Sequence, residues 1–401
     1  MDRTGRLLIY SHDSFGLGHL RRCQTIAHHL VDAFPELTVL ILSGSPIIGS
    51  FDFKSRVDFV RVPGVIKLRN GEYTPLRLHL GLEQTLAMRG SIVRHTADIF
   101  DPHLFLVDKE PLGLRGEVRD TLLMLKERGT RLVLGLRDVM DEPRSLLEEW
   151  RRKNVFPALY GLYDEIWVYG LPQIFDPLSE LPGMAGLADK LVFTGYLRRS
   201  LPPTPAQASE HELPDAPYIL VTTGGGGDGE DLIDWVLGAY EADPTIPHPA
   251  LLVFGPFMNL DRRRDFHERA ARLEQVYTIT FDARFEQLVA PALGVVAMGG
   301  YNTFCEILSF GKPALLVPRT APRQEQYLRA ERASRLGLVR VLPDDRVRAP
   351  GRMAEQLHAI AEWPRPRPEQ TPGLLGGLEQ IAEHAAPWLD GSKERSLPRS
   401  A

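Results

Sequence analysis

The sequence predicts an α/β protein built from two doubly wound parallel sheets, one in each half of the chain. Short continuous apolar runs alternate with longer helical patterns from end to end. Such runs are typical of parallel strands that helices cover on both faces. The alternation is interrupted by a proline-rich stretch near the middle and then restarts. At 401 residues the chain is also too long for one small core, so two domains are expected.

The first half, residues 1–200, is predicted to form the first Rossmann-like domain. Apolar residues recur at helical spacing from Leu20 to Phe34, which predicts an amphipathic helix that Pro35 ends. Apolar runs on either side of this helix and further along predict strands at 7–10, 38–42, 104–108, 132–136 and 165–168.

The second half is predicted to repeat the pattern after a linker at 201–217, where five prolines fall among few large apolar residues. Residues 218–362 are then the second Rossmann-like domain. A helix within 363–390 could cross back onto the first domain, and a polar tail follows at 391–401. The strands expected in the second domain are 218–222, 250–254, 277–281, 294–298 and 314–317.

Composition narrows the classes of function. Hydrophobic residues make up 43% and charged residues 25%, which is ordinary for a soluble globular protein. A net charge of −5 gives no reason to expect nucleic acid as a partner. We find neither a signal peptide nor an apolar window of membrane-spanning length, so a cytoplasmic protein is expected. Peripheral contact with the inner face of the membrane stays open.

The most informative segment is 298–306, where a predicted strand runs into Gly299 and Gly300 and then into a helix that opens with Asn302 and Thr303. Glycines let the backbone approach a phosphate, and the unpaired amides of a helix start carry partial positive charge. The segment therefore predicts an anion site. Glu306 falls four residues after Asn302, near the same helix face, where it could accept from a ribose diol.

Two further segments of the second half fit a nucleotide-sugar site. Glu325 and Gln326 offer polar groups to sugar hydroxyls. Four consecutive glycines after the first strand of this half, among them Gly224, Gly225 and Gly226, predict a loop that something approaches closely or that moves. A plain flexible turn is the alternative.

In the first half, the first strand leads into a turn with Gly16 and Gly18, and His19 follows at the mouth of the next helix. An imidazole at this place could act as general base near neutral pH, although a cap or surface role is the alternative. Asp108 ends another strand of the same sheet and could orient that imidazole, or form a salt bridge with Lys109.

Other motifs are absent or ambiguous. Arg137 and Asp138 follow a strand and could bind an acceptor or anchor a loop. The sequence has no paired-carboxylate metal motif at a strand end, no zinc spacing, no nucleophile elbow and no phosphate loop ending Gly-Lys-Ser/Thr. Chemistry without a metal or cofactor is expected, with the nucleotide-sugar as co-substrate.

Taken together, these motifs resemble those of the GT-B-fold glycosyltransferases. Gly300-Tyr-Asn-Thr-Phe-Cys-Glu306, followed by Glu325-Gln-Tyr-Leu-Arg-Ala330, is similar to their donor signature, Gly-Trp-Asn-Ser-x-x-Glu then Asp-Gln-x-x-Asn-Ala. The second half and its glycine loop resemble the N-acetylglucosaminyltransferases that complete lipid II. The segment Gly-Leu-Gly-His-Leu-Arg-Arg-Cys resembles UDP-sugar hydrolases of bacterial nonulosonic acid synthesis.

The resemblance implies two facing domains with a cleft between them, residues 1–200 on the acceptor side and residues 218–362 on the donor side, and a hexosyltransferase activity. The sugar would move from a nucleoside diphosphate donor, a UDP-sugar, to an unidentified acceptor that is a glycan, a lipid-linked molecule or a small molecule. Transfer would be inverting and metal-independent; a hydrolase with water as acceptor, or a non-catalytic nucleotide-sugar-binding protein, are the alternatives. The resemblance implies that His19 is the base and that Asp108 orients its imidazole. Gly300, Asn302 and Thr303 would bind the diphosphate. Glu306 would bind the ribose, and Glu325 and Gln326 the donor sugar.

This chain also departs from the family pattern. Met298 stands where a histidine is often found, and Arg329 replaces the usual asparagine. Glu325 replaces an aspartate. These positions are the ones by which the donor of a family member would be identified, so the departures leave the donor sugar unidentified.

Overall fold

The computed structural model describes residues 4–12, 17–68, 72–177, 184–201, 211–344 and 346–389. The chain divides into two compact units, which are treated separately below. Unit 1 contains residues 1–197 and 376–401, and unit 2 contains residues 198–375. The predicted linker lies mostly outside the described residues, as does the polar tail. Within the described residues, no helix is both long and apolar enough to cross a membrane.

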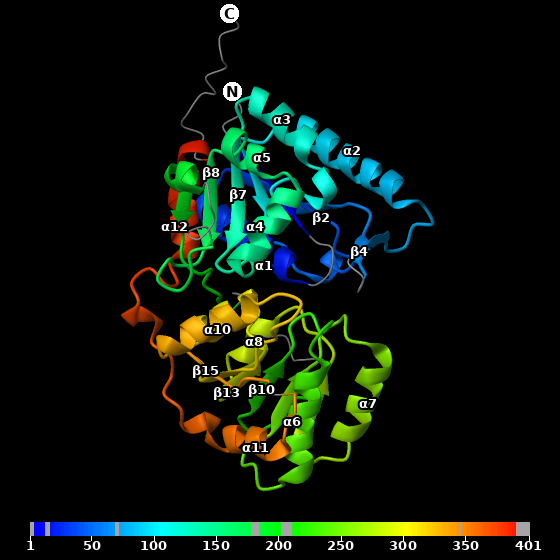
Figure 1. Cartoon of the computed structure of the whole chain (residues 1–401), viewed down its shortest axis with the longest axis vertical. Coiled ribbons are helices and arrows are strands. Elements are labelled where there is room, and N and C mark those ends of the chain that lie inside the picture. Colours follow the sequence, from blue (N-terminus) through cyan, green and yellow to red (C-terminus); the bar gives the residue numbers. More distant parts are fainter. Residues whose placement is uncertain are drawn as a thin grey trace, which may run out of the picture. The chain divides into compact units, whose positions relative to one another are not determined.

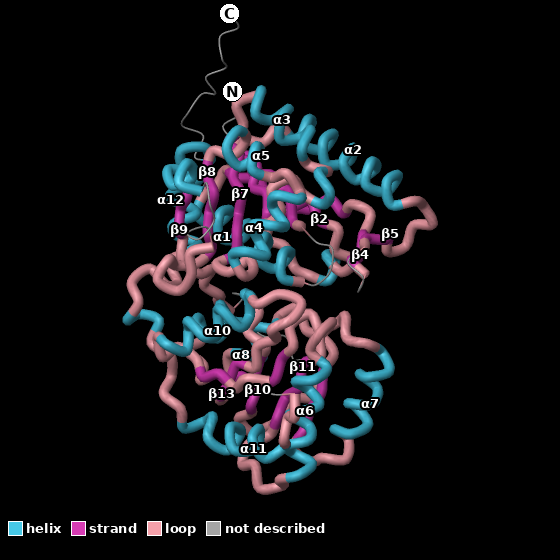
Figure 2. Tube along the Cα trace, viewed as in Figure 1, coloured by secondary structure: helices cyan, strands magenta, loops and turns pink. Residues whose placement is uncertain are grey.

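Unit 1 is built around a sheet in which seven strands of the described chain run parallel in the order β3-β2-β1-β6-β7-β8-β9. Its central strands are mostly buried apolar runs. Figure 2 shows the magenta strands lying between cyan helices. A separate antiparallel pair, β4 and β5, lies outside this sheet. The strands are β1 (Gly5–Ser11), β2 (Leu37–Ser43), β3 (Val57–Arg61), β4 (Val65–Lys67), β5 (Tyr73–Pro75), β6 (Leu104–Asp108), β7 (Arg131–Arg137), β8 (Glu165–Tyr169) and β9 (Leu191–Phe193).

Helices cover both faces of the unit 1 sheet. Right-handed crossovers place α1 on one face and α2 and α3 on the other, and α2 contacts α3 (Figure 1). The last helix, α12, packs on α1 and β1, so it returns to the unit in which the chain began. The helices are α1 (Gly18–Ala33), α2 (Leu82–Phe100), α3 (Arg119–Glu127), α4 (Pro143–Arg152), α5 (Phe156–Gly161) and α12 (Gly377–Leu389).

Side chains at the amino-terminal ends of two strands fix α12 in place. The Arg131 guanidinium lies 5.0 Å from the ring centre of Trp388. Arg131 also forms an ion pair of 2.7 Å with Glu165. A carboxylate oxygen of Glu165 lies 3.3 Å from Nδ1 of His384 in α12. Because Arg131 opens β7 and Glu165 opens β8, this contact lies at the sheet edge opposite to the carboxyl ends of the strands.

Unit 2 has a second parallel sheet, with six described strands in the order β12-β11-β10-β13-β14-β15. Helix α6 contacts α7 and α11 on one face, and α9 and α10 follow crossovers to the other face. The strands are β10 (Ile219–Thr222), β11 (Ala250–Val253), β12 (Val276–Ile279), β13 (Gly294–Ala297), β14 (Ala314–Leu316) and β15 (Arg340–Val341). The helices are α6 (Glu230–Ala242), α7 (Leu260–Ala270), α8 (Phe285–Val289), α9 (Tyr301–Ser309), α10 (Glu325–Arg335) and α11 (Pro350–Ala359).

Candidate active site

The strand order gives unit 1 a topological switch point between β1 and β6. The chain leaves β1 toward β2 on one side and leaves β6 toward β7 on the other. In open α/β sheets, ligands bind beyond the carboxyl ends of the strands at such a point. His12 directly follows β1, Asp108 is the last residue of β6, and His19 is the second residue of α1. The sequence therefore brings the predicted base and its predicted partner to the switch point.

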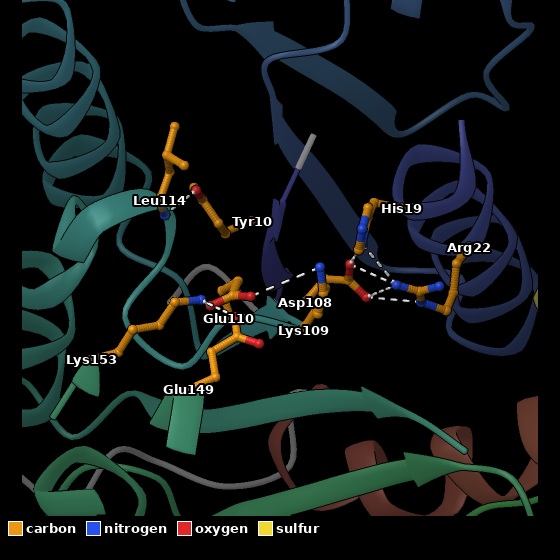
Figure 3. A network of polar contacts seen from close by, with 9 residues as sticks. All are labelled: Tyr10, His19, Arg22, Asp108, Lys109, Glu110, Leu114, Glu149 and Lys153. Carbon is orange, nitrogen blue, oxygen red and sulfur yellow. Dashed lines mark hydrogen bonds and ion pairs between the residues drawn. The ribbon is translucent and has the colours of Figure 1, made fainter. Parts of the chain in front are cut away.

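His19 and Asp108 form a direct contact (Figure 3). His19 Nδ1 is hydrogen-bonded to Asp108 Oδ2. The Asp108 side chain is 1% exposed and that of His19 14% exposed, so the carboxylate is enclosed while part of the imidazole reaches the surface. A carboxylate accepts and does not donate, so Nδ1 carries the proton and Nε2 keeps its lone pair. An imidazole in this tautomer can accept a proton through Nε2.

Arg22, which the sequence analysis did not select, holds the other side of Asp108. Its Nε donates to Oδ1 at 2.8 Å, and its Nη2 donates to Oδ1 and Oδ2, each at 2.7 Å. The Arg22 side chain is 1% exposed and lies over the ring of Tyr169, 5.8 Å from its centre. The signal was present in the sequence, because His19 and Arg22 are three residues apart and share one face of α1.

These charges set the protonation states. Burial lowers the pKa of His19 to about 4, aided by the Arg22 and Lys109 cations and opposed by Asp108. Burial alone would raise the pKa of the Asp108 carboxyl, but Arg22 and His19 hold it well below its usual range. At neutral pH the structure therefore contains a neutral imidazole beside an ionised carboxylate.

A second polar group lies next to this pair (Figure 3). Glu110 forms an ion pair of 2.7 Å with Lys153 and approaches Lys109 Nζ at 3.8 Å. The ring of His12 stands edge-on to that of His19, with 5.8 Å between the ring centres. His12 is buried, and its Nδ1 has no hydrogen-bond partner among the residues described. Burial lowers the pKa of His12, so this second imidazole is also neutral.

The remaining predicted residues of unit 1 have different placements. Gly16 lies outside the described residues, and Gly18 is the exposed first residue of α1. Arg137 ends β7 and is half-buried. Asp138 is fully buried and accepts a hydrogen bond of 2.7 Å from the Tyr196 hydroxyl. For Asp138 the geometry favours the loop-anchoring role over acceptor binding.

Unit 2 has its own switch point, between β10 and β13, and both predicted glycine segments lie there. Gly299 has a φ of +82°, which turns the chain from β13 into α9. Helix α9 begins after Gly300 without a side-chain cap, and the amides of a helix start carry the partial positive charge that attracts an anion. A Cβ added at Gly300 would meet no atom within 4 Å, so the space in front of this helix start is open.

The polar residues of α9 are more enclosed than a ligand site requires. Asn302 and Thr303 are each 8% exposed, and Glu306 is fully buried. The Asn302 Oδ1 accepts a hydrogen bond of 2.9 Å from Arg199 Nη2, so this side-chain oxygen is already bound within the unit. Glu306 presents no surface to a ribose in this structure, so neighbouring side chains would have to move before it could bind one.

The glycine-rich loop after β10 approaches another backbone. A Cβ at Gly226 would lie 2.4 Å from the Phe254 carbonyl oxygen, and one at Gly255 would lie 2.5 Å from the carbonyl carbon of Gly225. Phe257 N also donates to Gly225 O at 3.0 Å. The loop that follows β11 is therefore the close neighbour that these glycines accommodate, while Gly224 is exposed and has nothing within 4 Å of its added Cβ.

Glu325 and Gln326 meet at Arg319, a second residue that the sequence analysis missed. Arg319 Nη2 donates to Glu325 at 2.6 Å, and the backbone N of Arg319 donates to Gln326 Oε1 at 3.2 Å. Arg319 Nε forms an ion pair of 2.8 Å with Asp228 of the glycine-rich loop. One partly exposed arginine thus joins the two segments that were predicted to bind the donor.

The arginine that departs from the family pattern is also placed at this edge of the sheet. Arg329 is fully buried, and its Nη1 donates to the carbonyl oxygen of Gly299 at 3.0 Å. It also lies over the ring of Tyr301, 5.7 Å from its centre. Arg329 therefore supports the turn between β13 and α9 from inside the unit. Within the described ranges, no group of three or more His, Cys, Asp or Glu residues could hold a metal ion.

Comparison with known proteins finds a related family for one part of the chain. Residues 219–372, which make up most of unit 2, match the glycosyltransferase family 28 C-terminal domain. Unit 2 is therefore similar to that glycosyltransferase domain. No curated protein matches the chain by sequence.

Solved structures resemble the chain over nearly its whole length. The calicheamicin glycosyltransferase CalG4 is 19% identical, with a TM-score of 0.59 over 99% of this chain and 100% of its own. UGT2 of Phytolacca americana is 13% identical, with a TM-score of 0.59 over 99% and 97%. MurG of Acinetobacter baumannii is 11% identical, with a TM-score of 0.54 over 96% and 99%. The predicted GT-B fold and the predicted class of enzyme, a glycosyltransferase, are confirmed.

Proposed function

We propose that this chain transfers a sugar from a nucleoside diphosphate donor, a UDP-sugar, to an acceptor hydroxyl. The family of the glycosyltransferase domain in unit 2 supports transfer from an activated sugar. The donor type is supported by similar structures, of which one is described with UDP-2-fluoro-glucose and another, a UDP-GlcNAc 2-epimerase, with UDP-GlcNAc. The observation that carries the mechanism is the hydrogen bond from His19 to Asp108.

In this mechanism His19 is the general base. Its Nε2 takes the proton of the acceptor hydroxyl while the oxygen attacks the anomeric carbon. The bond from that carbon to the diphosphate oxygen breaks on the opposite side, so the configuration inverts. Asp108 stabilises the imidazolium that forms, as the carboxylate of a catalytic triad does.

The amino terminus of α9 would receive the charge of the leaving group. The amides that follow Gly300 have no side-chain cap, and the open space before them can accept a phosphate. Oriented amides stabilise developing negative charge because they need no reorganisation when it appears. This arrangement would perform the task that a divalent cation performs in metal-dependent transferases.

Product analysis with and without acceptors tests the proposal. The protein is incubated with UDP-, dTDP- and GDP-sugars in the presence of EDTA, with panels of glycans, lipid-linked sugars and small-molecule alcohols. We expect a glycoside of inverted configuration, detected by NMR, to form together with free nucleoside diphosphate. Rapid release of free sugar without any acceptor would instead favour the hydrolase alternative. No turnover and no binding of any nucleotide-sugar would contradict both.

A variant of the base completes the test. His19→Ala should lower kcat by about 10²- to 10⁴-fold, because one positioned general base contributes about that much. Donor affinity should stay near that of the wild-type protein, since the predicted diphosphate site lies in unit 2. Full turnover by His19→Ala would remove His19 from the mechanism.

A further inference from the structure

The described residues of unit 1 include two buried arginine–carboxylate pairs, and one of them contacts the predicted base. Arg22 and Asp108 are each 1% exposed, and so are Arg89 and Glu117. Taking two charges out of water costs more than their attraction returns unless further hydrogen bonds satisfy them, so such pairs are weak evidence for stability. Their value has to be sought in what the fixed charge does to its neighbours.

The two pairs differ in their third member. Glu117 accepts from the Tyr10 hydroxyl at 2.6 Å, and that hydroxyl in turn accepts from the backbone of Leu114. Asp108 accepts from His19 Nδ1, an imidazole that reaches the surface. Only the second arrangement, among these two, connects a buried arginine to a group that can exchange protons with a substrate.

Arg22 restricts Asp108 in two ways. Its fork contacts both carboxylate oxygens, so the carboxylate cannot rotate about its axis without losing a hydrogen bond. Its charge stabilises the ionised carboxylate, which can then only accept from His19. Arg22 Nη2 also lies 3.0 Å from His19 Nδ1. The guanidinium is permanently charged and cannot accept a proton, so it opposes protonation of the neighbouring imidazole.

We propose that Arg22 is the positioning residue of the base: it fixes the Asp108 carboxylate against His19 Nδ1 and, together with burial, keeps the imidazole neutral, with its lone pair on Nε2. The role of His19 as base rests on the proposed function, whereas the effect of Arg22 on its charge does not. The charged and titratable groups that face His19 are Asp108 from β6, Arg22 from its own helix, and Lys109 and His12 from the neighbouring strand ends.

A titration that needs no substrate tests the charge effect. The protein is labelled at its 12 histidines, the His19 resonance is assigned with His19→Gln, and its pKa is measured by NMR. In the wild-type protein we expect it at about 4. In Arg22→Gln the Asp108 anion is unopposed while the burial of the imidazole remains, so the pKa of His19 should rise measurably above 4. A pKa that stays near 4 in Arg22→Gln would overturn the proposal.

A conservative variant tests the positioning effect and covers the case in which Arg22→Gln does not fold. Arg22→Lys keeps the charge but loses the fork, because an ammonium is a point donor. The pKa of His19 should remain below 6.5, while kcat falls at least tenfold and the donor KM is unchanged. Wild-type kcat in Arg22→Lys would overturn the positioning role.

Arg89→Lys is the matched control, since it breaks a fork of equal burial on Glu117. It should lower the melting temperature about as much as Arg22→Lys does, yet leave kcat and the pKa of His19 unchanged. Equal effects of both variants on His19 would reduce Arg22 to a structural residue. If no donor is turned over by the wild-type protein, the proposed function fails, but the NMR titration still decides the effect of Arg22.

Discussion

His19 is held in a neutral state by its surroundings, and its activity should follow that state. Its pKa is lowered to about 4, mainly by burial, so the imidazole is unprotonated over the whole neutral range. We therefore expect kcat/KM for the best donor and acceptor to stay constant as the pH falls through 6.5 and to decline only toward pH 4. An acid limb near pH 6.5 in the rate profile would contradict this placement of His19.

The same lowered pKa predicts a pH dependence of stability. An unfolded chain binds a proton at His19 below pH 6.5, whereas the folded protein does so only near pH 4. Between these values the unfolded state binds more protons, so this contribution is fully present above pH 6.5 and is lost as the pH falls to 4. The loss should be about 3 kcal/mol. Urea unfolding at several pH values, compared with His19→Gln, measures it, and the variant should show the smaller slope.

Two adjacent glycines separate ligand binding from folding. A methyl group at Gly300 would enter open space in front of α9, and the φ of Gly300 is −57°, which any residue adopts. Gly300→Ala should therefore fold normally yet weaken binding of a nucleoside diphosphate by tenfold or more. Calorimetric titration with UDP measures the affinity.

Gly299→Ala is the comparison. It forces an alanine into a φ of +82° and toward Leu316 Cδ1 at 3.1 Å, so it should lower stability by about 1–2 kcal/mol. If Gly300→Ala binds UDP as the wild-type protein does, the diphosphate does not lie at this helix start.

At the residue scale, sequence patterns identified groups at strand ends but not the residues that hold them. His19 and Asp108 could be found because each stands beside a strand or a helix start. Arg22 had only its helical spacing to His19 as a signal, and its partner Asp108 lies 86 residues away. Arg199 and Arg319 had no such signal, because an arginine has no preferred place in these patterns.

At the scale of elements, Arg319 couples two segments that no strand or helix connects. It follows β14 and joins Asp228 in the glycine-rich loop to Glu325 at the start of α10. Arg319→Ala should raise the donor KM, since both segments lose a fixed position, while stability changes by no more than about 1 kcal/mol for a partly exposed pair. Steady-state kinetics and thermal unfolding measure the two effects.

Arg335→Ala serves as the control for that prediction. It removes an exposed pair with Glu331 on the same helix, one turn along α10. Its donor KM should equal that of the wild-type protein. If Arg319→Ala behaves in the same way, the coupling of loop and helix has no part in donor binding.

The strands that the sequence predicted are those whose side chains are buried in a hydrophobic core. Central strands such as β1, β6 and β13 are buried on both faces, and their continuous apolar runs were recognised. The pattern missed β3, β9 and β15, which lie at or next to the sheet edges and are short or partly polar. Their backbone pairs because a neighbouring strand offers hydrogen bonds, and a single sequence does not record that neighbour.

At the scale of the whole molecule, the two units have separate hydrophobic cores. Separate cores predict two unfolding transitions in differential scanning calorimetry. UDP, which is proposed to bind at α9, should raise the melting temperature of one transition in proportion to the logarithm of its concentration and leave the other unchanged. A single transition that UDP shifts as a whole would contradict independent unfolding.

The return of α12 to the unit of α1 and β1 has a consequence for biosynthesis. Ribosomes build the chain from its amino terminus, and domains commonly fold in the order in which they emerge. Unit 1 begins first but lacks α12 until unit 2 has been translated, while unit 2 is one continuous stretch. For the time that unit 2 takes to be made, on the order of 10 s or more, the apolar surface of α1 and β1 that α12 later covers stays uncovered. The nascent chain should therefore be a target for chaperones that recognise such surfaces, and the domain started first is the one finished last.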